Sequence, residues 1–214
     1  MSTALAAATA VWLWAGIVPA DIPAAVQTVY VYQGVIAEQD GVVRVERKGV
    51  HPHAGDARAI VPVVRFRGRP EPERVARELE ALAASWEARG RRVPMVQVDR
   101  DVASRLVGEH AQFVAAVRRA LNRKYALSVT ALADWLVAAD HASVIALARS
   151  ADEIVFQLYH ERHAVPQVGR FDAALETFEA PFKVGLLADM DLPPRAARSA
   201  QWRGSIVFLQ RAEP

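Results

Sequence analysis

The sequence predicts an α/β protein that folds as a small or degenerate (β/α)8 TIM-like barrel with thin first crossovers. About eight apolar segments have the length and alternation of strands, and at least three strand-helix-strand units occupy the middle of the chain. Polar side chains collect where several of these strands end. The 214 residues suit one domain over 1–214, although about 250 residues are typical of this fold. An open doubly wound sheet is the alternative, but no glycine-rich phosphate loop follows the first strand.

The first half of the chain has strands but few helical patterns. Strands are predicted at residues 11–15, 28–33 and 59–67. Gly34 is expected to end the second of them. Residues 42–47 alternate as an exposed strand does, between Gly41 and Gly49, so residues 35–58 are expected to form an extra hairpin and loop.

Helical patterns dominate the second half of the chain. The clearest covers residues 72–89, where Pro72 suits the first turn and Gly90 the position after the last. Further helices are expected at 102–123, with Leu106, Phe113, Val117 and Leu121 inward, at 140–149 with Asp140 as N-cap, and at 171–179. Strands are predicted at 93–101, 125–135, 153–160, 182–189 and 205–210.

The strand at 93–101 has two different faces, and it locates the candidate site. Val96 and Val98 point one way, while Gln97, Asp99 and Asp101 point the other way, because side chains alternate along a strand. In a barrel covered by helices, the polar face must line the interior. Carboxylates at the C-terminal end of the strand then lie at the mouth, where barrel enzymes place their sites.

The same reasoning gathers carboxylates, amides, arginines and aromatic rings at the mouth, which suits a sugar-binding cleft. Catalytic roles are expected for Asp99 as nucleophile or base, with Asp134 or Asp189 as the acid. Substrate-binding roles are expected for a wider set: Trp14, Gln33, Arg65, Arg67, Gln97, Asp101, Gln157 and Tyr159. Thr130 is expected at the mouth as well.

Two functions follow from these residues. The first is a carbohydrate-binding or glycoside-hydrolase-like barrel. The alternative is a non-catalytic barrel that binds a partner protein or a cell-envelope polymer, in which Asp99 and Asp101 pair with Arg65 and Arg67 as a structural ionic network. Carboxyls that face an open cleft favour the enzyme, whereas carboxyls that are all bonded to arginine favour the second function.

The composition argues against several other classes. With 26 basic and 24 acidic residues, the net charge is only +2, so no nucleic-acid partner is expected. No apolar run reaches the roughly 20 residues of a membrane span. Residues 4–18 have the apolar length of a signal-peptide core, but no Lys or Arg precedes Arg44, and both a cytoplasmic and an exported location stay open.

No metal or other cofactor is expected from the sequence. There is no cysteine to ligate zinc. Histidines occur as short pairs at 51–53 and 160–163, with no third ligand at a recognisable spacing. These histidines are interpreted as polar loop residues, and the oligomeric state is not determined by any pattern in the chain.

Several segments together carry a family resemblance: residues 12–16, 29–34, 96–101, 152–160 and above all 127–136. On these segments, the chain resembles the bacterial family called domain of unknown function 3142. The resemblance implies a barrel similar in outline to those of glycoside hydrolases, without an established activity. Where the family carries Asp-Phe-Asp or Asp-Tyr-Asp, this chain has Asp99-Arg100-Asp101. The middle residue lies on the outer face, so this difference is expected to concern packing.

Overall fold

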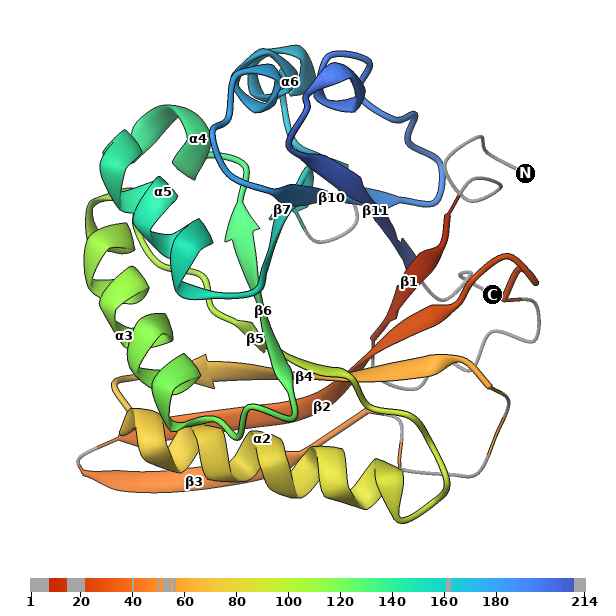
Figure 1. The fold of residues 1–214 in the computed structure, drawn as a ribbon. Helices are drawn as coiled ribbons and strands as arrows, with labels where there is room; N and C mark the ends of the chain where they lie inside the picture. The colour runs from red at the N-terminus through yellow and green to blue at the C-terminus, as the bar shows by residue number, and fades with distance from the viewer. Residues whose placement is uncertain are drawn as a thin grey trace.

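Eight parallel strands close into a barrel in the computed structural model, which describes residues 8–14, 22–39, 41–49, 51, 55, 57–160 and 163–209. The order around the ring is β1, β2, β4, β5, β6, β7, β10 and β11, and β11 pairs with β1 (Figure 1). Their bounds are β1 Ala10–Leu13, β2 Thr28–Gln39, β4 Ala59–Arg67, β5 Met95–Asp99, β6 Ala126–Leu132, β7 Glu153–Gln157, β10 Phe182–Leu187 and β11 Trp202–Leu209. The predicted TIM-like barrel is confirmed.

Helices lie on the outside of the ring over much of its circumference (Figure 1). They are α2 Pro72–Glu87, α3 Val107–Ala120, α4 Trp135–Ala138, α5 His141–Ser150 and α6 Val168–Glu176, with 3-10 turns η1 Ser104–Leu106 and η2 Ala196–Arg198. A short antiparallel ladder joins β8 Tyr159–His160 to β9 His163–Ala164. Between β2 and β4 the chain forms a strand, β3 Val42–Arg47, where a regular barrel has a helix.

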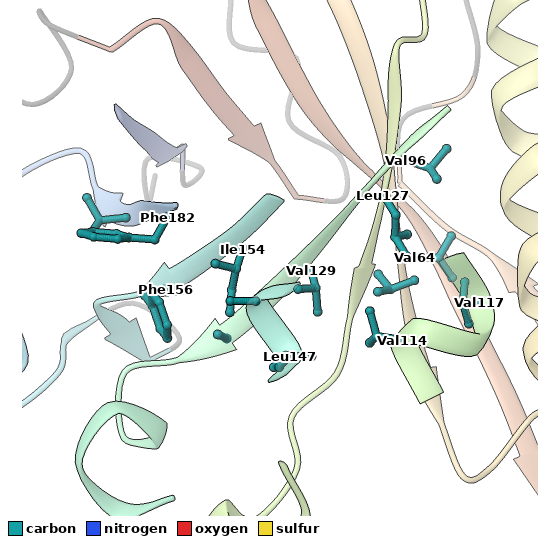
Figure 2. Close-up of a cluster of buried hydrophobic side chains, with 14 of the residues drawn as sticks. Val64, Val96, Val114, Val117, Leu127, Val129, Leu147, Ile154, Phe156 and Phe182 are labelled. Carbon is teal, nitrogen blue, oxygen red and sulfur yellow. The ribbon is translucent and has the colours of Figure 1, made fainter. Parts of the chain in front are cut away.

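The larger hydrophobic core lies between the strands and the helices. Val96, Leu127 and Val129 point outward from the barrel and pack with side chains of α3 and α5 (Figure 2). The side chains that point outward from these strands are apolar because helices cover that face.

A second, smaller core fills the inside of the barrel. It includes Trp12 and Tyr30 from the first strands, with Val63, Val155 and Ile206 from others. A cavity of about 10 Å³ between these side chains has room for one water molecule. Below its mouth, the interior that the described strands enclose is therefore a packed core.

The predicted hairpin is confirmed, but its position on β2 differs from the prediction. β2 continues past Gly34 to Gln39 and pairs antiparallel with β3. Gly34 has a φ of 131°, and a Cβ built there would meet the carbonyl oxygen of Glu46. The glycine therefore permits a close strand contact with a register shift against β4, and it does not end the strand.

The predicted helices are present, but several of their boundaries differ from the prediction. The helix over 72–89 is present as α2, and Asp140 caps α5 by accepting a hydrogen bond from the backbone N–H of Ser143 at 2.9 Å. The predicted inner face of the helix expected at 102–123 is partly right: Val117 and Leu121 are buried, whereas Leu106 and Phe113 are only partly buried. The buried stripe of α3 is Val107, His110, Ala111, Val114 and Val117. Other boundaries shift by a few residues: α3 begins at 107, α6 at 168 and β11 at 202, while β6 ends at 132 and β7 at 157.

Candidate functional site

Asp99 is the centre of a polar cluster at the C-terminal end of β5. Its side chain has no exposed surface. Arg65 of β4 donates from Nε to Oδ2 of Asp99 at 2.8 Å, and Thr130 of β6 donates from Oγ1 to Oδ1 at 2.6 Å. Three adjacent strands thus present inward-facing side chains that satisfy a buried carboxylate, as the strand alternation predicts.

Asp101 forms the solvent-facing rim of the same cluster. Its Oδ2 lies 3.4 Å from Nη2 of Arg65, and its side chain is 50% exposed. Partial burial and the negative charge of Asp99 raise the pKa of Asp101, while the charges of Arg65 and His160 oppose this shift. Asp101 is therefore a carboxyl group that both solvent and a ligand can reach.

Aromatic rings line the other side of the mouth. Trp14, directly after β1, stacks on Tyr32 with ring centroids 4.1 Å apart and an interplanar angle of 9°. The guanidinium carbon of Arg65 lies 5.4 Å from the Trp14 ring centroid, in the range of a cation–π contact. Deeper in the barrel, Tyr159 stacks on Phe208 at 5.2 Å. Sequence reasoning missed Tyr32 and Phe208, although Tyr32 shares its strand parity with inward Tyr30.

Tyr159, which was predicted at the mouth, belongs to the inner core of the barrel, where it stacks on Phe208. Its ring is almost fully buried. Burial and the charge of Asp99 raise the pKa of Tyr159 well above its ordinary value, so the phenol stays protonated. Gln157, also buried, has Nε2 3.5 Å from the Tyr159 hydroxyl.

Gln97 belongs to a separate network deeper in the barrel. It donates to the Ser128 hydroxyl at 2.9 Å, and Ser128 donates to Glu153 at 2.7 Å. Glu153 also accepts from the Tyr30 hydroxyl at 2.6 Å and pairs with Nζ of Lys183 at 2.6 Å. Glu153 and Lys183 lie at the N-terminal ends of their strands, the face that in such barrels contributes to stability.

Besides Gln97, four further predicted residues lie away from the cluster around Asp99. Gln33 faces outward, where it accepts a hydrogen bond from Nε1 of Trp86 in α2 at 3.0 Å, so its expected position at the mouth is wrong. Asp134 and Asp189 are exposed in the turns after β6 and β10, and no described contact joins either one to Asp99. Arg67 is exposed at the end of β4, where its charge lowers the pKa of Tyr32 against the effect of burial.

No group of three or more potential metal ligands occurs among the residues that the structure describes. The histidine pairs at 51–53 and 160–163 lie partly outside those residues, as does the apolar segment at 4–18. Within the described chain, no helix is both long enough and apolar enough to cross a membrane.

The strands that build the cluster also carry the family signal. Residues 56–180, more than half of the chain, match the family described as Domain of unknown function (DUF3142). The chain belongs to this family. A search of curated proteins finds no significant match. The DUF3142 match includes Arg65, Asp99, Asp101, Thr130 and Tyr159, whereas Trp14 precedes it.

Arg100 separates the two carboxylates in this DUF3142 chain, and it points away from them. Its guanidinium carbon lies 5.0 Å from the Phe66 ring centroid and 5.9 Å from that of Phe113. Nη2 donates to the carbonyl oxygen of Gly68 at 2.8 Å. Arg100 thus packs flat apolar surface on the outer face, where an aromatic residue would also fit.

Proposed function

We propose that the mouth of this DUF3142 barrel is a carbohydrate-binding site that holds its ligand without hydrolysing it. One observation carries the proposal: Arg65 joins buried Asp99, half-exposed Asp101 and the Trp14 ring through a single guanidinium. A fixed arginine, a reachable carboxylate and an aromatic ring therefore lie side by side at one surface.

These groups match the chemistry of a sugar. Arg65 offers N–H donors and Asp101 offers acceptor oxygens to neighbouring hydroxyls, and hydrogen bonds to charged groups are the stronger ones. The partly exposed ring of Trp14 offers apolar surface for the C–H face of a pyranose ring. Because Asp99 holds Arg65 from below, the donor geometry is fixed before a ligand arrives, which lowers the entropic cost of binding.

The geometry favours binding over hydrolysis. Glycoside hydrolysis needs two carboxyls that flank the scissile bond, roughly 5 to 9.5 Å apart. Asp99 has no exposed surface, and both of its oxygens already accept hydrogen bonds. The expected role of Asp99 as nucleophile or base is thus replaced here by a proposed positioning role, in which it orients Arg65.

The test is a panel of bacterial cell-wall and exopolysaccharide oligosaccharides, screened by thermal shift and followed by calorimetric titration. We expect at least one sugar to raise the Tm of the wild type, and Asp101→Asn to abolish this shift. The matched control is Asp152→Asn, since Asp152 is also an arginine-paired carboxylate with a 44% exposed side chain. The control should retain the shift.

Two results would overturn the proposal: no sugar raises the Tm of the wild type, or Asp101→Asn binds as tightly as the wild type. In the first case, a partner protein becomes the better candidate for this surface.

Hydrolysis is the second candidate, and one observation favours it. Asp101 is half-exposed, and burial and the charge of Asp99 raise its pKa, which suits a carboxyl group that donates a proton to a leaving group. In this mechanism Asp101 would be the general acid. Release of reducing sugar by the wild type, and its loss in Asp101→Asn, would establish hydrolysis in place of simple binding.

A further inference from the structure

A second cavity lies on the outside of the barrel, between the β2–β3 hairpin and α2. Its volume is about 240 Å³. The side chains that line it come from the hairpin, the segment after it and one face of the helix: Gln33, Arg47, Lys48, His51, Ala81, Leu82 and Ser85. Gln33 faces this outer side of β2, whereas Tyr32 faces the barrel interior, so the strand separates the cavity from the mouth.

The cavity has an excess of positive charge. Arg47 and Lys48 line it, and no acidic residue occurs among the lining residues that the structure describes. Glu78 is shared by two guanidiniums, Nη2 of Arg47 at 2.9 Å and Nη2 of Arg74 at 2.9 Å. One carboxylate thus faces two positive charges, and one of these charges is left to attract an anion.

The ion pair of Lys48 does not cancel this excess effectively. Nζ of Lys48 lies 2.8 Å from Glu46, and the two side chains are 50% and 61% exposed. Exposed pairs of this kind contribute little energy, because water screens both charges. Lys48 therefore remains available to an anion that arrives at the cavity.

The other wall of the cavity is mostly apolar. Ala81 and Leu82 of α2 form it, and the Ser85 hydroxyl donates to the carbonyl oxygen of Leu82 at 2.6 Å. The buried amide of Gln33 is held by Trp86, which fixes that side of the cavity. The cavity thus offers cations on one side and carbon surface on the other.

We propose that this cavity binds a small organic anion, with a carboxylate or phosphate on a compact apolar body. The volume is below the roughly 300 to 1,000 Å³ of sites for drug-sized ligands, which limits the ligand to a small molecule. An oxyanion can take a forked pair of N–H bonds from Arg47, while the apolar body contacts Ala81 and Leu82. This site is independent of the proposed carbohydrate site.

The experiment titrates the full chain with phenyl phosphate and with benzoate at low ionic strength, using calorimetry. The two probes distinguish a phosphate from a carboxylate as the preferred head group. We expect at least one probe to bind, and Arg47→Gln to weaken it at least about tenfold, the loss typical of one charge-assisted bond. Ala81→Leu should weaken binding as well, because the larger side chain fills the cavity without removing a charge.

The chain offers a matched control for each variant. Arg195→Gln removes one of two arginines that share Glu176, at 2.8 and 3.0 Å, an arrangement like that at Glu78 but away from the cavity. Ala84→Leu enlarges an exposed alanine of the same helix that does not line the cavity. Both controls should bind as the wild type does.

Absence of binding by both probes would overturn the proposal. So would equal binding in the wild type, Arg47→Gln and Ala81→Leu, which would indicate only diffuse attraction of anions to the surface. Circular dichroism of each variant shows whether it is folded, so a loss of binding can be assigned to the cavity.

Discussion

Arg65 donates a hydrogen bond from Nε to Oδ2 of Asp99 over 2.8 Å. The Arg65 side chain is 28% exposed, whereas that of Asp99 has no exposed surface. The carboxylate loses its hydration in this position, and Arg65 and Thr130 replace the lost water. A buried ion pair of this kind contributes little net stability. Removal of one partner is nevertheless destabilising, because the charge of the other partner then stays buried without an opposite charge.

Asp99→Asn therefore should lower the free energy of unfolding by about 2 kcal/mol, since it removes a bond to a charged group while keeping the shape. Urea unfolding at pH 7 measures this loss. Asp134→Asn is the control: Asp134 is exposed, and such surface changes usually stay within about 0.5 kcal/mol. Equal losses in the two variants would contradict the structural importance of the Arg65–Asp99 pair.

The pKa of Asp101 should report the charge of Asp99 directly. Burial and the charge of Asp99 raise this pKa above 3.8, and Arg65 lowers it. Asp99→Asn removes a raising effect and leaves Arg65 in place, so the pKa of Asp101 should fall in that variant. Carbon-13 NMR titration of the carboxyl group measures it. Thr130→Val keeps both charges and should preserve the raised pKa.

The raised pKa of Asp101 also determines how this residue changes the stability of the protein with pH. The folded state binds the Asp101 proton more tightly than the unfolded chain does. The contribution of Asp101 to stability is thus present below about pH 3.8 and is lost as the pH rises through the folded-state pKa. A pKa of Asp101 that is unchanged by Asp99→Asn would mean that the two carboxyls are not coupled.

Gly34→Ala should be more destabilising than Gly41→Ala, although both glycines have positive φ. A Cβ at Gly34 would clash with the carbonyl oxygen of Glu46, whereas a Cβ at Gly41 meets no heavy atom within 4 Å. Gly41→Ala should cost about 1 kcal/mol from backbone strain alone. Gly34→Ala should cost more than about 2 kcal/mol, because β2 and β3 must also separate.

Urea unfolding of both variants checks this difference. Equal costs would indicate that the hairpin yields at Gly34 without loss of packing, and that the close contact with Glu46 is not required for stability.

Strand alternation predicted the core of the site but not its edges. The inward positions of Asp99 and Arg65 were predictable because polar side chains occupy one face of β5 and of the end of β4, while apolar side chains occupy the other face. The position of Gln33 was not predictable. β2 is buried on both faces, so the residues that face inward and those that face outward are both mainly apolar. The indole of Trp86, distant in sequence, shows which side the amide of Gln33 faces.

Asp134 was misplaced for a different reason. Its parity is inward if β6 continues, but the backbone at Asp134 has already turned to φ −58° and ψ −28°. A strand boundary is uncertain by two or more residues in sequence reasoning, and each residue of error reverses the face. Residues at strand ends are therefore the least predictable members of a barrel mouth.

His110 should make the protein less stable at acidic pH. Its ring is 1% exposed between Phe66 and Trp135, and neither ring nitrogen has a hydrogen-bond partner within the described chain. Burial, with a smaller effect from the charge of Arg100, lowers the pKa of His110 to about 3. The unfolded chain binds this proton near pH 6.5, so stability is present above that pH and is lost as the pH falls toward 3.

His110→Phe removes this proton-binding difference and keeps a ring of similar shape in the aromatic cluster. Between pH 6 and pH 4, the wild type should lose up to about 1.4 kcal/mol per pH unit more than the variant does. Urea unfolding at several pH values gives both slopes. His141→Phe, at the exposed start of α5, should retain the wild-type slope. If His110→Phe also kept that slope, other groups would have to cause the acid sensitivity, and the neutral state of the buried imidazole would contribute nothing to it.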